Sequence, residues 1–394
     1  MTAQQPRSAA ENREKRRQKP LRVFFVHEHM LGHRTYVANL RAGLAPYTDL
    51  QITWLAMDNR YFVRAARHVP GLRPHWSLWG SAQALLQLLR AGGATADVLV
   101  FRTQSIAQLA WPLMRRIPTI LSLDATQTGL HAMAAAYGHQ PPHSSPYDRL
   151  VAWVNRRTYH AARALVCMSH WAARSLVAEY GIDPAAVVVN PDGIDVDYWR
   201  PGPARDTAGG PVRVLFVGGD FERKGGPVLL DALAHIDLPW ELHLVTNATT
   251  LPVPPEHAGR VHVHRGLTSN APELVALYAS CDVFALPTLG DCYSMATIEA
   301  MASGLPAICS DVGGIAEIVI DGETGFLIQP GDGAALAARL RTLLSDAALR
   351  QRLGAAGRRR AEASFDLRAR AATFHQTIWA ITRQPQGVTM GAHR

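Results

Sequence analysis

Cysteine is scarce in this sequence, and the few cysteines present do not form pairs. The 394 residues include four, at Cys167, Cys281, Cys292 and Cys309, and no two of them have a C-x-x-C spacing. Secreted domains held by disulfides and zinc-ribbon domains both need closely spaced cysteines. We therefore expect neither class of protein, and a reducing, cytoplasmic setting fits the cysteine content.

Long hydrophobic runs are also lacking. Charges interrupt every apolar stretch before the roughly 18 residues that a membrane-spanning helix needs. Residues 1–20 have no apolar centre, so they do not read as a signal peptide. They hold six bases and two acids, which is +4 of the formal net charge of +8, and we expect a disordered basic tail. Nothing in the sequence pairs basic and aromatic residues in the way that nucleic-acid readers do.

The sequence does contain alternating strand and helix patterns, in two halves. The first half opens with an apolar, β-branched run at 21–29 followed by a helical pattern, and the same opening recurs at 211–236. Such alternation predicts an α/β fold with parallel sheets covered on both faces. A stretch dense in proline and glycine at 196–212 reads as a linker. We predict two Rossmann-like domains facing a cleft, at residues 21–195 and 213–365.

One stretch of the second half has the features of an anion-binding helix start. It runs from Asp291 to Ser294, a residue type that caps helices, and places Glu299 in the first turns. Unpaired N–H groups at a helix start favour a diphosphate. Lys224, which precedes two glycines, would add a cation there. Glu299 suits a ribose diol, although an isolated helical glutamate is usually solvated.

The ordered motifs of the second half resemble those of the retaining glycosyltransferases of family 4. They read "RKGG" at 223–226, "IEAMASGLP" at 298–306 and "SDVGGIAEIV" at 310–319, with "GETGFLIQPGD" next. The likeness covers most of residues 160–365 and is only architectural over residues 20–150. It implies the α/β GT-B fold, in which a last helix crosses back to the N-terminal acceptor domain. The segment at about 366–382 has the apolar spacing for that helix.

The resemblance also implies an activity. A hexose would move from a nucleoside diphosphate sugar to a hydroxyl acceptor with retention of configuration, and with no metal required. A nucleotide-sugar epimerase or a phosphorylase of the same fold is an alternative. A catalytically silent scaffold that binds sugar nucleotides is another. The acceptor stays open between a glycan, a lipid-linked precursor and a small molecule.

The predicted site residues fall into three groups. The catalytic residues are Lys224, Asp291, Glu299 and Asp124. The donor-binding residues are Gly219, Arg223, Lys224, Gly266, Leu267, Asp291, Cys292, Tyr293, Ser294, Met295 and Glu299. The acceptor-side residues, placed there because ligands bind beyond the carboxyl ends of parallel strands, are Gly32, His33, Thr126 and His131.

The sequence departs from the family pattern at three positions. Asp291 stands where the family has glutamate, one methylene longer. The arginine that usually precedes the lysine by five or six residues is missing near Gly218, which leaves Arg223 as a substitute. Asp124 stands where many relatives have a histidine, unless His131 fills that role. These changes bear on the donor sugar more than on the fold.

Two further patterns each have two interpretations. His27, His29 and His33 have a spacing that could ligate a metal. A strand-to-helix turn facing the cleft explains them equally well, so no metal site is predicted. Residues 59–80 interleave four arginines with aromatic residues, which suits either peripheral contact with anionic lipid at the inner face of the cell membrane or a packed helix.

Overall fold

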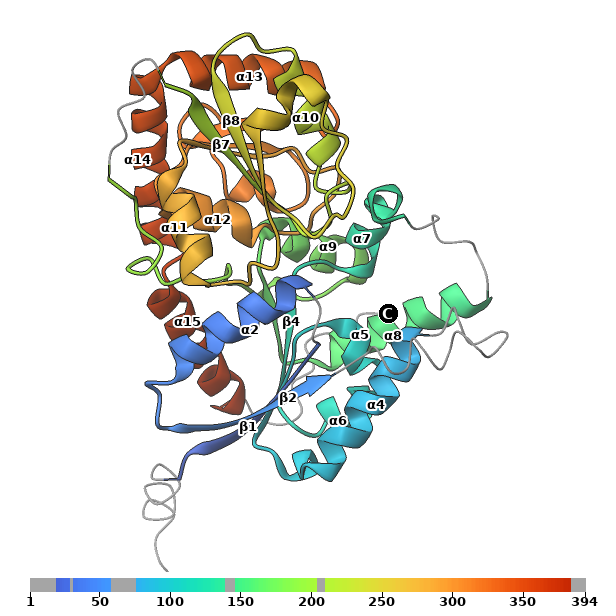
Figure 1. The fold of residues 1–394 in the computed structure, drawn as a ribbon. Helices are drawn as coiled ribbons and strands as arrows, with labels where there is room; N and C mark the ends of the chain where they lie inside the picture. The colour runs from blue at the N-terminus through green and yellow to red at the C-terminus, as the bar shows by residue number, and fades with distance from the viewer. Residues whose placement is uncertain (1–18, 29–30, 58–75, 139–145, 204–209, 384–394) are drawn as a thin grey trace, which may run out of the picture.

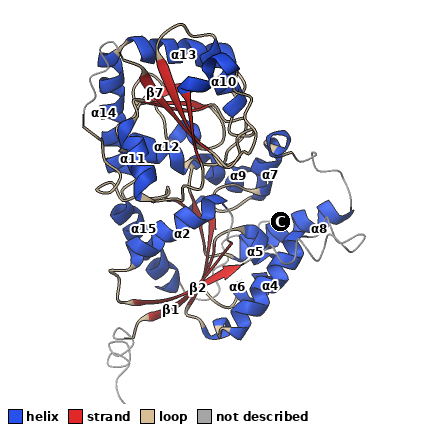
Figure 2. Cartoon of the chain, viewed as in Figure 1, coloured by secondary structure: helices blue, strands red, loops and turns tan. Residues whose placement is uncertain are grey.

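The computed structural model describes residues 19–28, 31–57, 76–138, 146–203 and 210–383. Two α/β domains stand one above the other, each with a sheet between layers of helices (Figures 1 and 2). Every strand pair in both sheets is parallel, as the alternating pattern predicts.

The first sheet has the strand order β2-β1-β3-β4-β5-β6. Its strands are β1 (Leu21–Glu28), β2 (Leu50–Met57), β3 (Val98–Phe101), β4 (Thr119–Leu123), β5 (Ala164–Cys167) and β6 (Val187–Val189). The helices around it are α2 (Leu31–Leu44), α4 (Trp76–Arg90), η2 (Gly93–Thr95), α5 (Gln104–Ala107), η3 (Gln108–Ala110), α6 (Trp111–Met114), α7 (Gln127–Ala132), η4 (Ala134–Tyr137), α8 (Pro146–Ala161), α9 (His170–Tyr180) and η5 (Pro184–Ala186).

The second sheet has the order β12-β11-β10-β7-β8-β9. Its strands are β7 (Val212–Val217), β8 (Trp240–Val245), β9 (Val261–His264), β10 (Val283–Leu286), β11 (Ala307–Ser310) and β12 (Gly325–Ile328). The helices are α10 (Gly226–Ala234), η6 (Pro255–Arg260), α11 (Pro272–Ser280), α12 (Met295–Ala302), η7 (Ile315–Glu317), α13 (Gly333–Ser345), α14 (Ala347–Ser364) and α15 (Leu367–Arg383). The winding reverses between β7 and β10, and ligands of open α/β sheets bind at such a point.

The last helix, α15, packs on the first domain, beside α2 (Figure 1). Phe374 is fully buried, with its ring centroid 6.2 Å from that of Phe25 in β1. Gly43 in α2 permits this approach, because a Cβ there would lie 2.7 Å from the Cβ of Ala371. The predicted fold class, with its C-terminal helix crossing back to the N-terminal domain, is therefore confirmed.

The segment that joins the domains is well packed at its start. Val196 and Trp199, at the beginning of the predicted linker, are already buried in the core of the second domain. Asn39 of α2 donates to the Gly193 carbonyl (2.9 Å), and Asn270 of the second domain donates to Asn39 (2.9 Å). A hydrogen-bonded chain thus ties both domains to the hinge.

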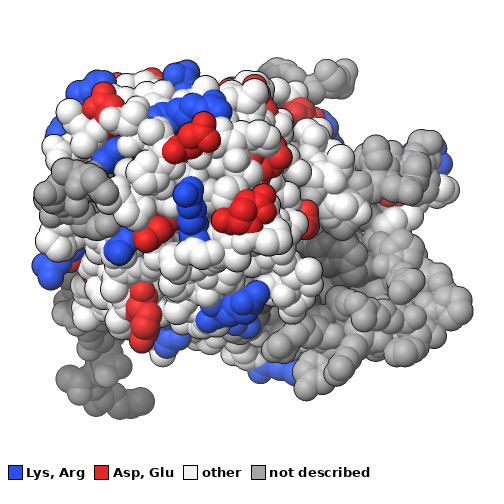
Figure 3. All heavy atoms as spheres, turned by 45° about the horizontal axis from the view of Figure 1, so that its top comes forward, with Lys and Arg blue, Asp and Glu red and all other residues white. Residues whose placement is uncertain are grey.

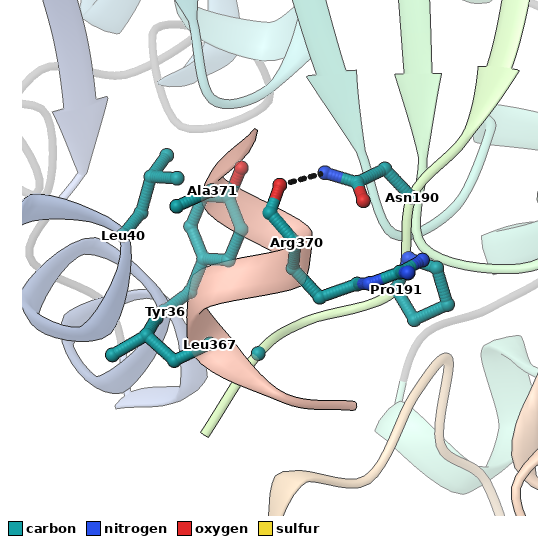
Figure 4. Close-up of a pocket in the computed structure, with 8 residues that line it drawn as sticks. Tyr36, Leu40, Asn190, Pro191, Leu367, Arg370 and Ala371 are labelled. Carbon is teal, nitrogen blue, oxygen red and sulfur yellow. Dashed lines mark hydrogen bonds between the residues drawn. The ribbon is translucent and has the colours of Figure 1, made fainter. Parts of the chain in front are cut away.

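A small pocket lies in this hinge, between α2, α15 and the chain after β6 (Figure 4). Asn190 donates from its side-chain amide to the Arg370 carbonyl (3.1 Å) at its wall. With a cavity volume of about 10 Å³, the pocket has room for one water molecule. It is a packing feature of the hinge and lies away from the loops at the reversal point of the second sheet.

Two surface features bear on partners. On the face in Figure 3, basic and acidic side chains are interspersed and do not gather by sign. Within the described residues, none of the helices combines the length and the apolar character needed to cross a bilayer.

Candidate functional site

Three loops meet at the reversal point of the second sheet. They follow β7 (218–225), β10 (287–294) and β11 (311–314). The middle loop ends where α12 begins, and the Ser294 hydroxyl accepts a hydrogen bond from the Thr297 N–H (3.3 Å). The predicted helix cap is therefore present, and the first N–H groups of α12 are oriented toward the loops.

Glycines allow these loops to touch. Gly225 has a φ of +80°, and a Cβ there would lie 1.8 Å from the Pro287 carbonyl oxygen. A Cβ on Gly313 would lie 2.1 Å from the Asp291 carbonyl oxygen, and the Gly314 N–H donates to the Cys292 carbonyl (2.9 Å). The glycines of two separate motifs thus hold one loop, 287–294, from both sides.

Lys224 and Asp291 form a charge-assisted hydrogen bond at the centre of the site. Their side chains are only 17% and 9% exposed, so the pair is largely shielded from water. Lys224 is the only lysine in the sequence after Lys19. A diphosphate arriving at the start of α12 would compete with Asp291 for this ammonium group.

Glu299 is buried in the second turn of α12. Its carboxylate accepts a hydrogen bond from the Tyr278 hydroxyl of α11 (3.0 Å). Burial raises the pKa of Glu299 to about 7, against the opposing effect of that hydrogen bond. Ionised Glu299 therefore carries a desolvation cost, which hydrogen bonds from the hydroxyl groups of a ligand would offset.

Arg223 lies between the second domain and Tyr137 of the first domain. Its guanidinium donates to the Gly290 carbonyl (2.7 Å) and to Asp220 (3.0 Å), and stacks on the Tyr137 ring of η4 at 4.5 Å. The side chain is committed to these contacts as the structure stands. Whether it replaces the missing family arginine in the donor complex stays a prediction.

Cys292 is covered by the first domain. Its thiol lies 3.7 Å from the Tyr137 hydroxyl, within a cluster that includes Met133. Burial raises the pKa of the Cys292 thiol well above its ordinary value. It is therefore a thiol and not a thiolate, which argues against a nucleophile here.

A charged cluster lies at the carboxyl ends of β3 and β4 in the first domain. Asp124, directly after β4, lies 3.5 Å from His33 Nε2 of α2 and 4.0 Å from Arg102, which follows β3. Burial would raise the pKa of Asp124, but the hydrogen bond with His33 and the charge of Arg102 overcome it and hold that pKa well below its usual range. Asp124 is therefore a fixed negative charge. Burial raises the pKa of neighbouring Asp192 to about 7.

The other predicted residues have structural roles or lie in loops and helix ends. Thr126 caps α7, because its hydroxyl accepts from the Gly129 N–H (3.1 Å), a structural task. Gly32 lies in the first turn of α2, and His131 in the last turn of α7. Gly219 and Gly266 lie in the loops after β7 and β9. Leu267, Tyr293 and Met295 are packed against the core of the second domain.

The two described histidines of the triple-histidine pattern lie in different elements. His27 is buried in β1, whereas His33 faces Asp124 from α2. His29 lies outside the described residues.

Several residues of the site were not predicted from the sequence. They are Tyr278, Tyr137, Arg102, Asp192 and Glu317. Glu317 accepts hydrogen bonds from the backbone N–H groups of His170 and Trp171 (both 2.6 Å), so a second-domain carboxylate caps helix α9 of the first domain. The position of Glu317 at the end of the "SDVGGIAE" motif is the sequence feature that could have pointed to it.

Comparison with known proteins agrees with this architecture. A family model described as Glycosyltransferase Family 4 matches residues 19–198, and one described as Glycosyl transferases group 1 matches residues 211–346. The MMP alpha-(1->4)-mannosyltransferase of Mycolicibacterium hassiacum is 30% identical over 340 residues, covering 82% of this chain and 76% of that protein. The glycogen synthase of Mycobacterium tuberculosis is 29% identical over 288 residues, covering 68% of this chain and 66% of that protein's length.

Solved structures show the same fold. HepE of Anabaena, in complex with UDP-glucose, superposes with a TM-score of 0.67 at 17% identity, covering 91% of this chain and 100% of that one. Two parallel-sheet domains with loops meeting between them define a GT-B protein. Within that class, this chain belongs to glycosyltransferase family 4.

Proposed function

We propose that the protein transfers a hexose from a nucleoside diphosphate sugar to a hydroxyl acceptor, with retention of configuration at the anomeric carbon. The observation that carries the proposal is the shielded Lys224–Asp291 pair beside the capped start of α12. Membership of family 4 and the likeness to HepE, solved with UDP-glucose, support a sugar nucleotide as donor.

Each site residue has a stated task in this proposal. Lys224 and the first N–H groups of α12 bind the diphosphate and stabilise the charge that grows on it as the bond to the sugar breaks. Glu299 accepts hydrogen bonds from the ribose hydroxyls. Asp291, released from Lys224, orients the sugar. The acceptor oxygen bonds to the anomeric carbon on the face that the diphosphate leaves, and its proton passes to a diphosphate oxygen.

Asp124 completes the site from the other side of the cleft. As a carboxylate held ionised by His33 and Arg102, it can accept a hydrogen bond from a sugar hydroxyl but has no proton to give. We assign it to orienting the transferred sugar or the acceptor. None of these steps calls on a metal ion.

Product stereochemistry tests the reaction class. We expect incubation with UDP-glucose, GDP-mannose and related donors, across a panel of glycan, glycolipid and small hydroxyl acceptors, to give a product whose anomeric configuration in NMR equals that of the donor. An inverted product contradicts the retaining mechanism. Tight nucleotide binding without transfer from any donor favours a silent scaffold.

The acceptor domain has an apolar, basic surface that suits a lipid-linked acceptor. The stretch at 59–80, for which lipid contact is one of the two interpretations, lies mostly outside the described residues. Trp79, Leu86 and Leu89 form an exposed stripe along α4. Trp153 of α8 is 49% exposed, and the Arg157 guanidinium stacks on its ring at 4.6 Å. Both helices pack on the α5–η3 segment, and we propose that this face rests on anionic membrane lipid.

Vesicle co-sedimentation measures this contact directly. We expect the chain lacking residues 1–20 to bind vesicles of mixed phosphatidylglycerol and phosphatidylcholine at low salt, and to bind pure phosphatidylcholine poorly. The Trp153→Ser variant should bind the anionic vesicles several-fold less well, since it removes exposed aromatic area. Equal binding by both proteins, or none by either, contradicts the proposal.

A further inference from the structure

We propose a second ligand site, on the outer edge of the second sheet, where Glu241, His243 and His262 bind a divalent metal ion of the zinc class. One ligand atom from each of the three lies within 4.8 Å of the others. Within the described residues this is the group whose histidine and carboxylate atoms converge in that way. It is separate from the loops at the start of α12, so it stands or falls independently of the proposed transfer reaction.

The register of the sheet brings these side chains to one face. In the parallel ladder, His243 of β8 pairs with His262 of β9, and Val245 pairs with His264. Glu241 lies two residues before His243, and residues two apart share a face of a strand. On the next strand inward, Leu215 of β7 is the partner of His243. The apolar Leu215 of β7 is thus followed outward, on β8 and β9, by a row of imidazoles.

The imidazole rings are stacked in register. The His243 ring lies 5.0 Å from that of His262 and 5.4 Å from that of His264, with interplanar angles of 28° and 20°. The stacking brings ring nitrogens of β8 and β9 close to the Glu241 carboxylate on the same face of the sheet.

The hydrogen bonding of His243 leaves one nitrogen for a ligand. Its Nδ1 lies 3.1 Å from His264 Nε2, whereas its own Nε2 is buried with no hydrogen-bond partner. If Nδ1 carries the proton and donates to His264, then Nε2 is unprotonated and its lone pair is free to bind a metal ion. That is the usual arrangement of a metal-bound histidine, whose other N–H is held by an acceptor. His264 is then the residue that fixes the tautomer.

The remaining ligands complete an open site. Glu241 Oε2 lies 3.9 Å from His243 Nε2, and Arg213 holds that same oxygen from the other side (3.1 Å). Ligand atoms of tetrahedral zinc are roughly 3.4 Å apart, given Zn–N distances of about 2.0–2.1 Å. Exposed His262 can close the remaining gap by a rotamer change. Two histidines and a carboxylate leave the fourth position to water.

Such an ion would clamp the edge strand of the sheet. β9 is only four residues long and, among the strands that the structure describes, pairs with β8 alone. The loop that follows it contains Gly266 and Leu267, two of the predicted donor-binding residues. A metal bridge between β8 and β9 would therefore stabilise the strand that leads into this loop.

Zinc binding by the full-length chain tests this site. We expect competition with a chromophoric chelator to show one zinc equivalent per chain whose affinity falls at least tenfold in His262→Ala. Zinc should raise the Tm of the parent protein and leave that of His262→Ala unchanged. With Co²⁺, the visible spectrum should lack a thiolate charge-transfer band, because no cysteine is a ligand.

His235→Ala is the matched control. His235 is at the exposed end of α10, where its Nδ1 lies 2.8 Å from the Asp231 carbonyl oxygen, outside the histidine row. This variant should bind zinc as the parent does. Equal zinc affinity in His262→Ala and His235→Ala, or the absence of any zinc-dependent change in Tm, overturns the proposal.

Discussion

Replacing Lys224 by alanine is expected to lower kcat/KM for the sugar nucleotide at least a hundredfold, about 2.7 kcal/mol in transition-state terms. The ammonium group is largely shielded from water, so its charge acts on the diphosphate with little screening. Its loss also leaves Asp291 as a buried carboxylate without its cation, which repels the diphosphate. Steady-state kinetics with the donor identified by the product screen measure the effect.

A double variant separates the two causes. Lys224→Ala with Asp291→Asn removes the orphaned carboxylate and should recover part of the nucleotide affinity but little of kcat, because the cation is still missing at the leaving group. Lys19→Ala is the control for removing a lysine remote from the site. If UDP binds Lys224→Ala as tightly as the parent, the diphosphate site has been placed wrongly.

The scarcity of lysine permits a second measurement on the unmodified chain. Lys15 and Lys19 lie at the N-terminal end, and Lys224 is the only other lysine. We expect UDP to protect Lys224 from an amine-reactive acylating reagent, as read by mass spectrometry of the digest. Lys19, which is exposed, serves as the internal reference whose labelling does not change.

The helix start and the glycine loops of the candidate site could be predicted because their determinants are local in the sequence. The start of α12 depends on a capping serine and on residues within one turn of it. Gly225 and Gly313 are required by steric contacts that admit no Cβ, and each lies in a glycine-containing motif that is visible in the sequence. These features fix where the loops meet before any long-range contact is known.

The partners of these residues could not be predicted in the same way. Tyr278 reaches Glu299 from another helix, Tyr137 covers Arg223 from another domain, and Glu317 caps a helix of the first domain. Each contact depends on how separate elements pack. Thr126 shows the converse, since a residue chosen for its position at a strand end serves as a helix cap.

Glu299→Gln is expected to make the protein more stable at alkaline pH and less active. The folded-state pKa of Glu299 is about 7, against 4.5 for an ordinary glutamate. Below pH 4.5 the acid is neutral in both states. As the pH rises from there through 7, only the unfolded state ionises freely, so stability is lost, by about 3 kcal/mol in full. Glutamine does not ionise and escapes this loss.

Thermal melts at two pH values measure the stability effect. The Tm of Glu299→Gln should exceed that of the parent only slightly at pH 5, just above the unfolded-state pKa, and by several degrees at pH 8. Asp124→Asn is a control of opposite sign. The pKa of Asp124 is held below its usual range, so its charge stabilises the fold at pH 8 and its removal should lower the Tm there. A Tm difference for Glu299→Gln that does not change with pH contradicts the assignment of a buried, costly carboxylate.

The activity of Glu299→Gln tests whether the buried carboxylate, which lowers the stability of the fold, binds the ribose. A carboxylate accepts two charge-assisted hydrogen bonds from a ribose diol, whereas an amide offers one neutral acceptor and two donors that the diol does not need. We expect kcat/KM to fall at least tenfold, about 1.4 kcal/mol, and UDP affinity to fall with it.

Because donor binding favours the ionised form of Glu299, the UDP affinity of the parent should increase as the pH rises to 7, and that increase should vanish in Glu299→Gln. A variant that is more stable yet binds UDP with unchanged affinity and pH dependence would place the ribose elsewhere and leave Glu299 a structural residue.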